Sequence, residues 1–192
     1  MSITSVKSGA TGISLALDNN FMEPIATTLV GSGGVNQVTF NDIPQTYKHL
    51  QIRATSRTTQ SATGTNYWFA YCNNDRATNY SYHILTGDGA SASAQAEVNT
   101  TYLLGGQAPR DSQLSSTYSI AVFDLLDYAN TNKYKTVRAL SGVDYNAASP
   151  PGYVRLISGN WRSFDAVTSL TIIPEASNFS QYSRFSLYGI KG

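Results

Sequence analysis

The sequence alternates short strand-forming runs with turn residues along most of its length, and this pattern limits the possible folds most strongly. Leu50, Ile52 and Ala54 alternate with polar residues, as in a strand that is buried on one face only. No stretch shows the 3.6-residue period of a long amphipathic helix. The pattern therefore predicts an all-β protein, a jelly-roll-like β-sandwich of about ten short antiparallel strands.

The strand-forming runs can be placed from their β-branched and aromatic residues and from the turns between them. The first two runs flank Gly31–Gly34, so we expect them to form a hairpin with a glycine-rich loop. Residues 118–126 are apolar on both faces except at Asp124, which is typical of a central strand or of one covered by a partner. The expected runs are residues 25–30, 35–40, 50–54, 67–72, 82–85, 98–104, 118–126, 136–143, 154–158, 167–173 and 184–190.

The chain of 192 residues is long enough for one well-buried domain. Residues 1–23 differ from the rest, since they are rich in Ser, Gly and Thr and carry only isolated apolar residues. Such a segment is either a frayed terminus or an extended arm that pairs with a neighbouring subunit. We therefore expect an N-terminal arm over 1–23 and a single β-sandwich domain over 24–192.

Composition excludes several classes of function. Only 13% of the residues are charged and the net charge is +1, whereas a nucleic-acid binder normally carries a clustered basic excess. No apolar stretch approaches the roughly 20 residues needed to cross a bilayer. The first residues also lack the charged start and apolar run of a secretion signal. We expect a protein made in a cytoplasm that binds neither nucleic acid nor a membrane.

The residues that usually carry chemistry are sparse. Cys72 is the single cysteine and stands among aromatic residues, so we expect an ordinary buried thiol. His49 and His83 have no ligand at metal-like spacing. We expect His49 to be solvated and His83 to be an ordinary sheet residue. Asp124 and Asp127 are three positions apart, which on an extended strand places them on opposite faces. The sequence predicts no catalytic residues, no metal and no cofactor.

Aromatic residues offer a second functional hypothesis. If several were exposed on one face, their rings would stack on the sugar rings of a glycan. The competing interpretation is that they fill the sandwich core, where large aromatics contribute most of the buried surface. The candidate glycan contacts are Trp68, Tyr80, Tyr82, Tyr145, Tyr153 and Trp161.

Three stretches of the sequence carry a recognisable pattern. Residues 38–53 resemble the opening, and Asn79–Tyr82 resemble a middle motif, of a family of tailed-phage virion proteins found among phages of aquatic bacteria, including cyanobacteria. The most specific stretch runs from residues 156–163 through Ile172–Pro174 to residues 185–191. The resemblance covers roughly residues 25–192 and implies jelly-roll-type domains that serve as head decoration (cement) proteins or as parts of fibres.

The resemblance implies a non-enzymatic protein on the exterior of the capsid, assembled in the host cytoplasm, with the major capsid protein as its partner. A homotrimer placed where three capsomers meet would clamp all of them at once. The anchor candidates in the arm are Ile3, Ile13, Leu15, Leu17 and Phe21.

Two other functions stay open. The alternative is a tail-fibre or receptor-binding module that contacts host surface glycans through the aromatics. A polysaccharide hydrolase would need two carboxyl groups roughly 5–9.5 Å apart, and the sequence nominates no such pair.

Overall fold

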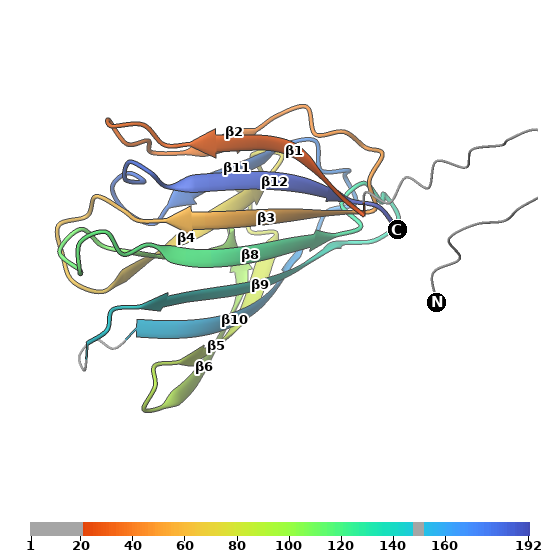
Figure 1. The fold of residues 1–192 in the computed structure, drawn as a ribbon. Coiled ribbons are helices and arrows are strands. Elements are labelled where there is room, and N and C mark those ends of the chain that lie inside the picture. Colours follow the sequence, from red (N-terminus) through yellow and green to blue (C-terminus); the bar gives the residue numbers. More distant parts are fainter. Residues whose placement is uncertain (1–20, 148–151) are drawn as a thin grey trace, which may run out of the picture.

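The computed structural model describes residues 21–147 and 152–192. In these residues the chain forms twelve β-strands and no helix, which confirms the all-β prediction. The strands form two sheets packed as a β-sandwich (Figure 1). Their bounds are β1 Met22–Leu29, β2 Val38–Phe40, β3 His49–Ser56, β4 Thr65–Cys72, β5 Tyr80–Gly87, β6 Ala92–Thr100, β7 Leu103–Pro109, β8 Ser119–Leu126, β9 Lys135–Asp144, β10 Gly152–Trp161, β11 Leu170–Pro174 and β12 Arg184–Ile190.

The two sheets differ in size. The larger has eight strands in the order β1-β12-β3-β8-β9-β10-β5-β6, and the smaller has four in the order β2-β11-β4-β7. All pairings within the sheets are antiparallel. In Figure 1 the larger sheet lies in front, with β1 at the top and the β5–β6 hairpin at the bottom. One face of the larger sheet therefore packs on the smaller sheet, and the other face is on the outside of the sandwich.

The core is formed by residues that alternate along the strands. Leu50, Ile52 and Ala54 of β3 are buried, which confirms the expected alternation. Trp68 of β4 is fully buried near the middle of the core and contacts the rings of Phe123 and Phe185. Side chains from both sheets therefore meet in one continuous hydrophobic core, as in other sandwiches.

The fully buried β7 carries two glycines because Trp68 occupies the space beside it. A Cβ atom added at Gly105 would lie 1.9 Å from the Trp68 ring, and one added at Gly106 would lie 2.7 Å from the indole nitrogen. Neither distance is compatible with a side chain. The two glycines thus form the wall of the Trp68 site, which explains why a buried strand contains residues that are normally unfavourable there.

The expected hairpin around Gly31–Gly34 is wrong. The strand before it, β1, pairs with β12 in the larger sheet, and the strand after it, β2, pairs with β11 in the smaller sheet. The connection is fixed by the chain near Phe179, since the N–H of Val30 donates to the Ser183 carbonyl and Val35 forms a β-bridge with Phe179. The glycine-rich segment is therefore a crossing between sheets.

A second expectation is also wrong, since the run 98–104 is not one strand. It contains the end of β6, a turn at Thr101 and Tyr102, and the start of β7. Residues 92–97, which make up most of β6, fall between the expected runs 82–85 and 98–104, in an Ala-rich stretch without an apolar period. In the structure β6 lies at the edge of the larger sheet and is exposed on both faces up to Thr100, so no core contact selects apolar residues there.

Arg57 fixes the loop between β7 and β8. Its guanidinium is almost completely buried and donates hydrogen bonds to four backbone carbonyls of that loop. The acceptors are Asp111, Gln113, Leu114 and Thr117, at distances of 2.8 to 3.0 Å. One buried side chain thus replaces the regular hydrogen bonds that this loop lacks.

The first described residues belong to the sandwich. The Lys191 N–H donates to the carbonyl of Phe21, and β1 begins at Met22, two residues before the boundary expected at Pro24. Glu23 accepts a hydrogen bond from the Tyr47 hydroxyl and forms an ion pair with Lys191 at 2.6 Å. Met22 and Glu23 therefore belong to a strand of the domain.

Candidate interaction surface

The outer face of the larger sheet carries several exposed large apolar side chains. In an antiparallel sheet, residues paired across strands lie in rows, and every second residue of a strand points to the same face. The register of the eight strands therefore defines which outward residues are neighbours. Two adjacent rows of outward residues are apolar. They begin near the start of β8 and cross five strands, from β8 through β9, β10 and β5 to β6.

The first of these rows is made mainly of leucines. Val122 pairs with Leu140, Leu140 with Leu156, Leu156 with Leu85, and Leu85 with Ala94. The three leucines are 49% to 53% exposed. Such side chains are normally buried when they stand together in this way.

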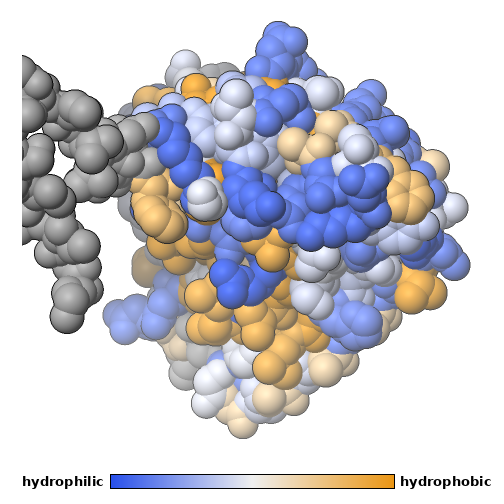
Figure 2. Space-filling view, turned by 90° about the vertical axis from the view of Figure 1, so that its right-hand side faces the viewer, coloured by the Kyte–Doolittle hydropathy of each residue, from blue (hydrophilic) through white to orange (hydrophobic). Residues whose placement is uncertain are grey.

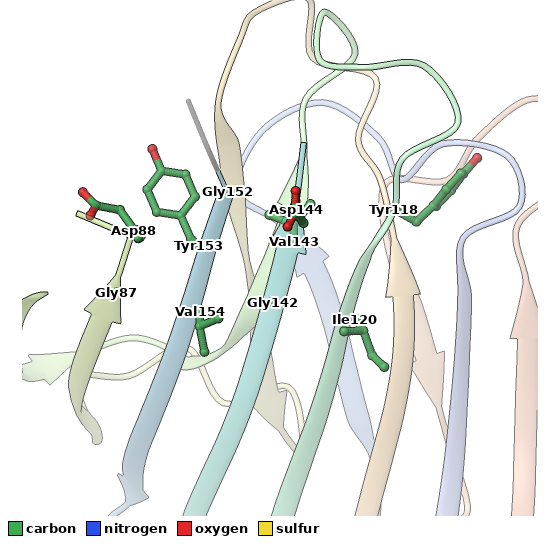
Figure 3. A pocket seen from close by; sticks show the side chains of 11 residues that line it. Gly87, Asp88, Tyr118, Ile120, Gly142, Val143, Asp144, Gly152, Tyr153 and Val154 are labelled. Atoms are coloured by element: carbon green, nitrogen blue, oxygen red, sulfur yellow. The ribbon is translucent and has the colours of Figure 1, made fainter. Parts of the chain in front are cut away.

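In the second row, large apolar residues alternate with glycines. Ile120 pairs with Gly142, Gly142 with Val154, Val154 with Gly87, and Gly87 with Ala92. Ile120 and Val154 are each 61% exposed. Figure 3 shows them on either side of Gly142, on β8 and β10. We name the ten residues of both rows the apolar stripe.

The missing side chain of Gly142 leaves a shallow depression of about 620 Å³ in the apolar stripe (Figure 3). Its walls include Ile120 and Val154, and Tyr153 and Asp88 lie beyond Val154. A Cβ atom at Gly142 would make only an ordinary 3.6 Å contact with the Tyr153 carbonyl oxygen. The depression is therefore not required by the packing of this chain.

A polar row borders the apolar stripe. Asp124 accepts hydrogen bonds from Arg138 at 2.7 Å and from Gln51 at 2.8 Å, one on each carboxylate oxygen. Ser158 and His83 continue the row across β10 and β5. Both oxygens of Asp124 are thus occupied by neighbouring side chains, and the carboxylate has a structural role.

The remaining part of the outer face, over β1, β12 and β3, is mostly polar. Arg53 lies over the Tyr188 ring, with its guanidinium 5.5 Å from the ring centre, and donates to Gln51. Thr27 donates to the Ser186 hydroxyl. The outer face therefore combines an apolar area with a polar surround, which is the usual composition of a protein–protein interface.

Apolar surface also occurs at the end of the sandwich where the C terminus lies. Figure 2 views the molecule from that end, and hydrophobic residues gather in its lower half, at the height of β9, β10 and β5 in Figure 1. The exposed rings of Tyr134 and Phe164 pack on one another, with centres 4.9 Å apart. These rings add to the apolar surface without being part of the stripe.

The candidate glycan contacts do not form an exposed face. Trp68, Tyr80, Tyr82, Tyr145 and Trp161 are buried, and Tyr153 is half-buried at the rim of the depression. Trp161 packs against Tyr80, and its indole N–H donates to Asp75 at 2.8 Å. Because five of the six rings are in the interior, they are not available to stack on a sugar.

The proposed anchor residues fall mainly outside the described part of the chain. Ile3, Ile13, Leu15 and Leu17 precede residue 21. Phe21 is described and is 76% exposed beside the start of β1. Its exposure makes it available to a partner, and the role of the other four stays a prediction.

The cysteine and the two histidines that were considered as functional residues have structural roles or ordinary positions in the sheet. Cys72 is fully buried, as expected, and burial raises the pKa of its thiol well above the usual range. His49 is half-buried, in contrast to the expected solvated residue, and its Nδ1 accepts the Asp127 N–H at 2.9 Å. His83 is an exposed sheet residue on the outer face. None of these arrangements pairs a nucleophile with a base.

Within residues 21–147 and 152–192, no three His, Cys, Asp or Glu side chains come close enough together to hold a metal ion. The same residues contain no helix that is long and apolar enough to cross a membrane.

The comparisons with known proteins add no relative. No protein-family model, no curated protein and no solved structure matches the chain.

The apolar stripe was only partly visible in the sequence. The two-sided apolar character of residues 118–126 predicted a central or covered strand. In the structure its outward residues include Ile120, which is exposed, and Val122, which is half-buried. The contribution of Leu85, Leu140 and Leu156 depends on the strand order, which places three distant segments side by side.

Proposed function

We propose that this chain is a non-enzymatic structural protein of a tailed-phage virion, and that it acts as a decoration protein on the exterior of the head. The observation that supports this proposal best is the apolar stripe on the outer face of the larger sheet. A wide, shallow, apolar surface with a polar surround suits a protein partner better than a small substrate.

The rest of the molecule is consistent with a binding role. A sandwich with a continuous core is a rigid support, and a rigid support lowers the entropy that is lost when a partner binds. The surface carries few charges, so association with the major capsid protein would depend on shape and apolar contact more than on long-range attraction.

The experiment that tests this proposal is quantitative mass spectrometry of purified virions, with the copy number of this chain compared with that of the major capsid protein. We expect a simple ratio that corresponds to hundreds of copies per particle. A few copies, or a few dozen, would contradict the decoration role and assign the protein to the tail. Absence from purified virions would overturn the proposed function as a whole.

A further inference from the structure

We propose that the apolar stripe is the contact between two copies of this chain, which pack with the outer faces of their larger sheets together about a two-fold axis. This inference rests on the proposed function, in which the protein works as part of an assembly. It names the partner that covers the stripe.

The arrangement of the second row supports a second copy as the partner. Along that row the residues follow the order Ile120, Gly142, Val154 and Gly87 on neighbouring strands. A two-fold axis that runs parallel to the strands, between β9 and β10, places Val154 of each copy opposite Gly142 of the other. The same axis places Ile120 opposite Gly87. One surface thus supplies both the projecting side chains and the depressions that receive them, which is the requirement for an isologous contact.

The first row fits the same axis. Leu140 and Leu156 lie on the two strands beside the axis, so each faces the other across the contact. Val122 and Leu85 are one strand further out on either side and also face each other. Two packed sheets keep their strands within about 30° of one another, so these pairs stay close to the axis.

The polar row introduces no repulsion. In this arrangement Asp124 faces His83 of the second copy, and Arg138 faces Ser158. Arg53 of β3 faces Ala94 of β6. No two outward side chains of like charge oppose one another over the six strands from β3 to β6, so the contact carries no electrostatic penalty of the kind that excludes wrong partners.

The size of the overlap is also sufficient. Six strands, at a spacing of about 4.8 Å and with four outward residues each, cover roughly 800 Å². A standard protein–protein interface buries about 800 Å² on each partner. The two apolar rows would form its centre, and the polar row with Arg53 and Arg138 would form part of its rim.

The first test measures the mass of the full-length protein in solution by sedimentation equilibrium over a range of concentrations. We expect a dimer, and we expect Leu156→Asp to raise its dissociation constant by on the order of 100-fold or more, since a carboxylate would be buried without a partner. Leu29→Asp is the matched control, because it makes the same change at a leucine that is 56% exposed on β1, outside the six strands of the contact. Thermal unfolding of the dilute variants verifies that both are folded.

The second test examines the register. Gly142→Cys and Val154→Cys are produced as separate proteins, mixed in equal amounts and treated with a short bis-maleimide, because facing sheets lie about 10 Å apart, which is farther than a disulfide reaches. We expect a cross-linked pair that contains one chain of each kind. A mixture of Gly142→Cys with Thr55→Cys should not form such a link, because Thr55 lies on β3, away from the axis. The buried Cys72 does not compete.

The outcomes separate this inference from the proposed function. A protein that stays monomeric at every concentration measured by sedimentation equilibrium overturns the second copy as partner. An oligomer that Leu156→Asp leaves intact overturns it as well. A dimer without the expected cross-link overturns the two-fold arrangement. A trimer, as expected from the resemblance, overturns it as well. If a monomeric protein binds capsids and Leu156→Asp abolishes that binding, the stripe contacts the capsid and the decoration role survives.

Discussion

Trp68 shows how strongly one residue constrains its neighbours. The indole fills the space beside β7 so completely that Gly105 and Gly106 have no room for a Cβ atom. Because Phe123 and Phe185 also contact the ring, Trp68 cannot shift to make room for an added atom.

Gly105→Ala should therefore destabilise the protein. The added methyl group would lie within 1.9 Å of the ring, and overpacking of a core commonly costs about 1–3 kcal/mol. The measurement is the midpoint of urea unfolding. Gly33→Ala is the control, since a Cβ atom there meets nothing within 4 Å and the residue lies outside the apolar stripe. Equal midpoints for the two variants would contradict this account of the β7 glycines.

Asp75 gives the fold a sensitivity to acid. Burial raises the pKa of its carboxyl, but hydrogen bonds from Asn79, Trp161 and the Ala77 N–H outweigh that effect and lower the pKa overall. A carboxyl whose pKa is lower in the folded than in the unfolded state stabilises the fold at pH values above the unfolded pKa, about 3.9. This contribution disappears as the pH falls through the lower pKa of the folded state.

Asp75→Asn should make stability less dependent on pH in this range. We expect the variant to be less stable than the wild type at pH 6, because all three donors lose their anionic acceptor, and to lose less stability between pH 5 and pH 2.5. Urea unfolding at a series of pH values measures both effects. Parallel curves for the two proteins would rule out this role of Asp75.

At the scale of elements, the loop between β7 and β8 depends on Arg57. Four carbonyls of the loop share one buried guanidinium, so the loop conformation and the position of the start of β8 are coupled to this side chain. Hydrogen bonds to a charged group are stronger than those between neutral groups.

Arg57→Met should release the loop while keeping much of the buried volume. We expect a loss of stability of about 2–4 kcal/mol and faster cleavage by chymotrypsin after Leu114, which is already exposed. Arg53→Met on the outer face is the control, because Arg53 is exposed and donates to one side chain only. Equal cleavage rates for the two variants would contradict the proposed role of Arg57.

The sequence predicts elements well where one face is buried and poorly where both faces have the same environment. The strand β3 could be predicted from its alternating pattern, because every second residue is buried in the core and is apolar. The edge strand β6 is exposed on both faces, and β7 is buried along its whole length, so neither has an alternating pattern. The hairpin expected around Gly31–Gly34 failed because a glycine-rich turn does not specify which sheet the next strand joins.

At the scale of the whole molecule, the candidate surface could not be predicted because it depends on strand order. Residues 85, 122, 140 and 156 are distant in sequence, and only the order β8-β9-β10-β5 makes them neighbours. Each stands next to a buried apolar residue of its own strand, so the local sequence does not mark it as outward-facing. The aromatic residues were more conspicuous in the sequence, yet most of them are in the core, where large rings contribute most to burial.

The sandwich should not need residues 1–20 for its stability. The described contacts of its first strand begin at Phe21, whose carbonyl accepts the Lys191 N–H, and continue through β1. A chain that starts at Phe21 should unfold within about 0.5 kcal/mol of the full-length protein, the range typical of changes away from the core. Urea unfolding checks this, and a clearly lower midpoint would show that the removed segment stabilises the domain.

The same truncation tests the arm as a capsid anchor. We expect the shortened protein to fail to co-sediment with capsids that bind the full-length chain. Normal binding of the truncated protein would remove the anchor role from Ile3, Ile13, Leu15 and Leu17.

The burial of Cys72 gives the folded protein a built-in reporter. It is the single thiol of the chain, it is inaccessible, and its raised pKa leaves almost no thiolate to react. A maleimide should therefore label the protein only when the sandwich opens, so the labelling rate would measure how often it opens during assembly. A dye attached to a cysteine introduced on the surface would, for the same reason, mark one site on each copy.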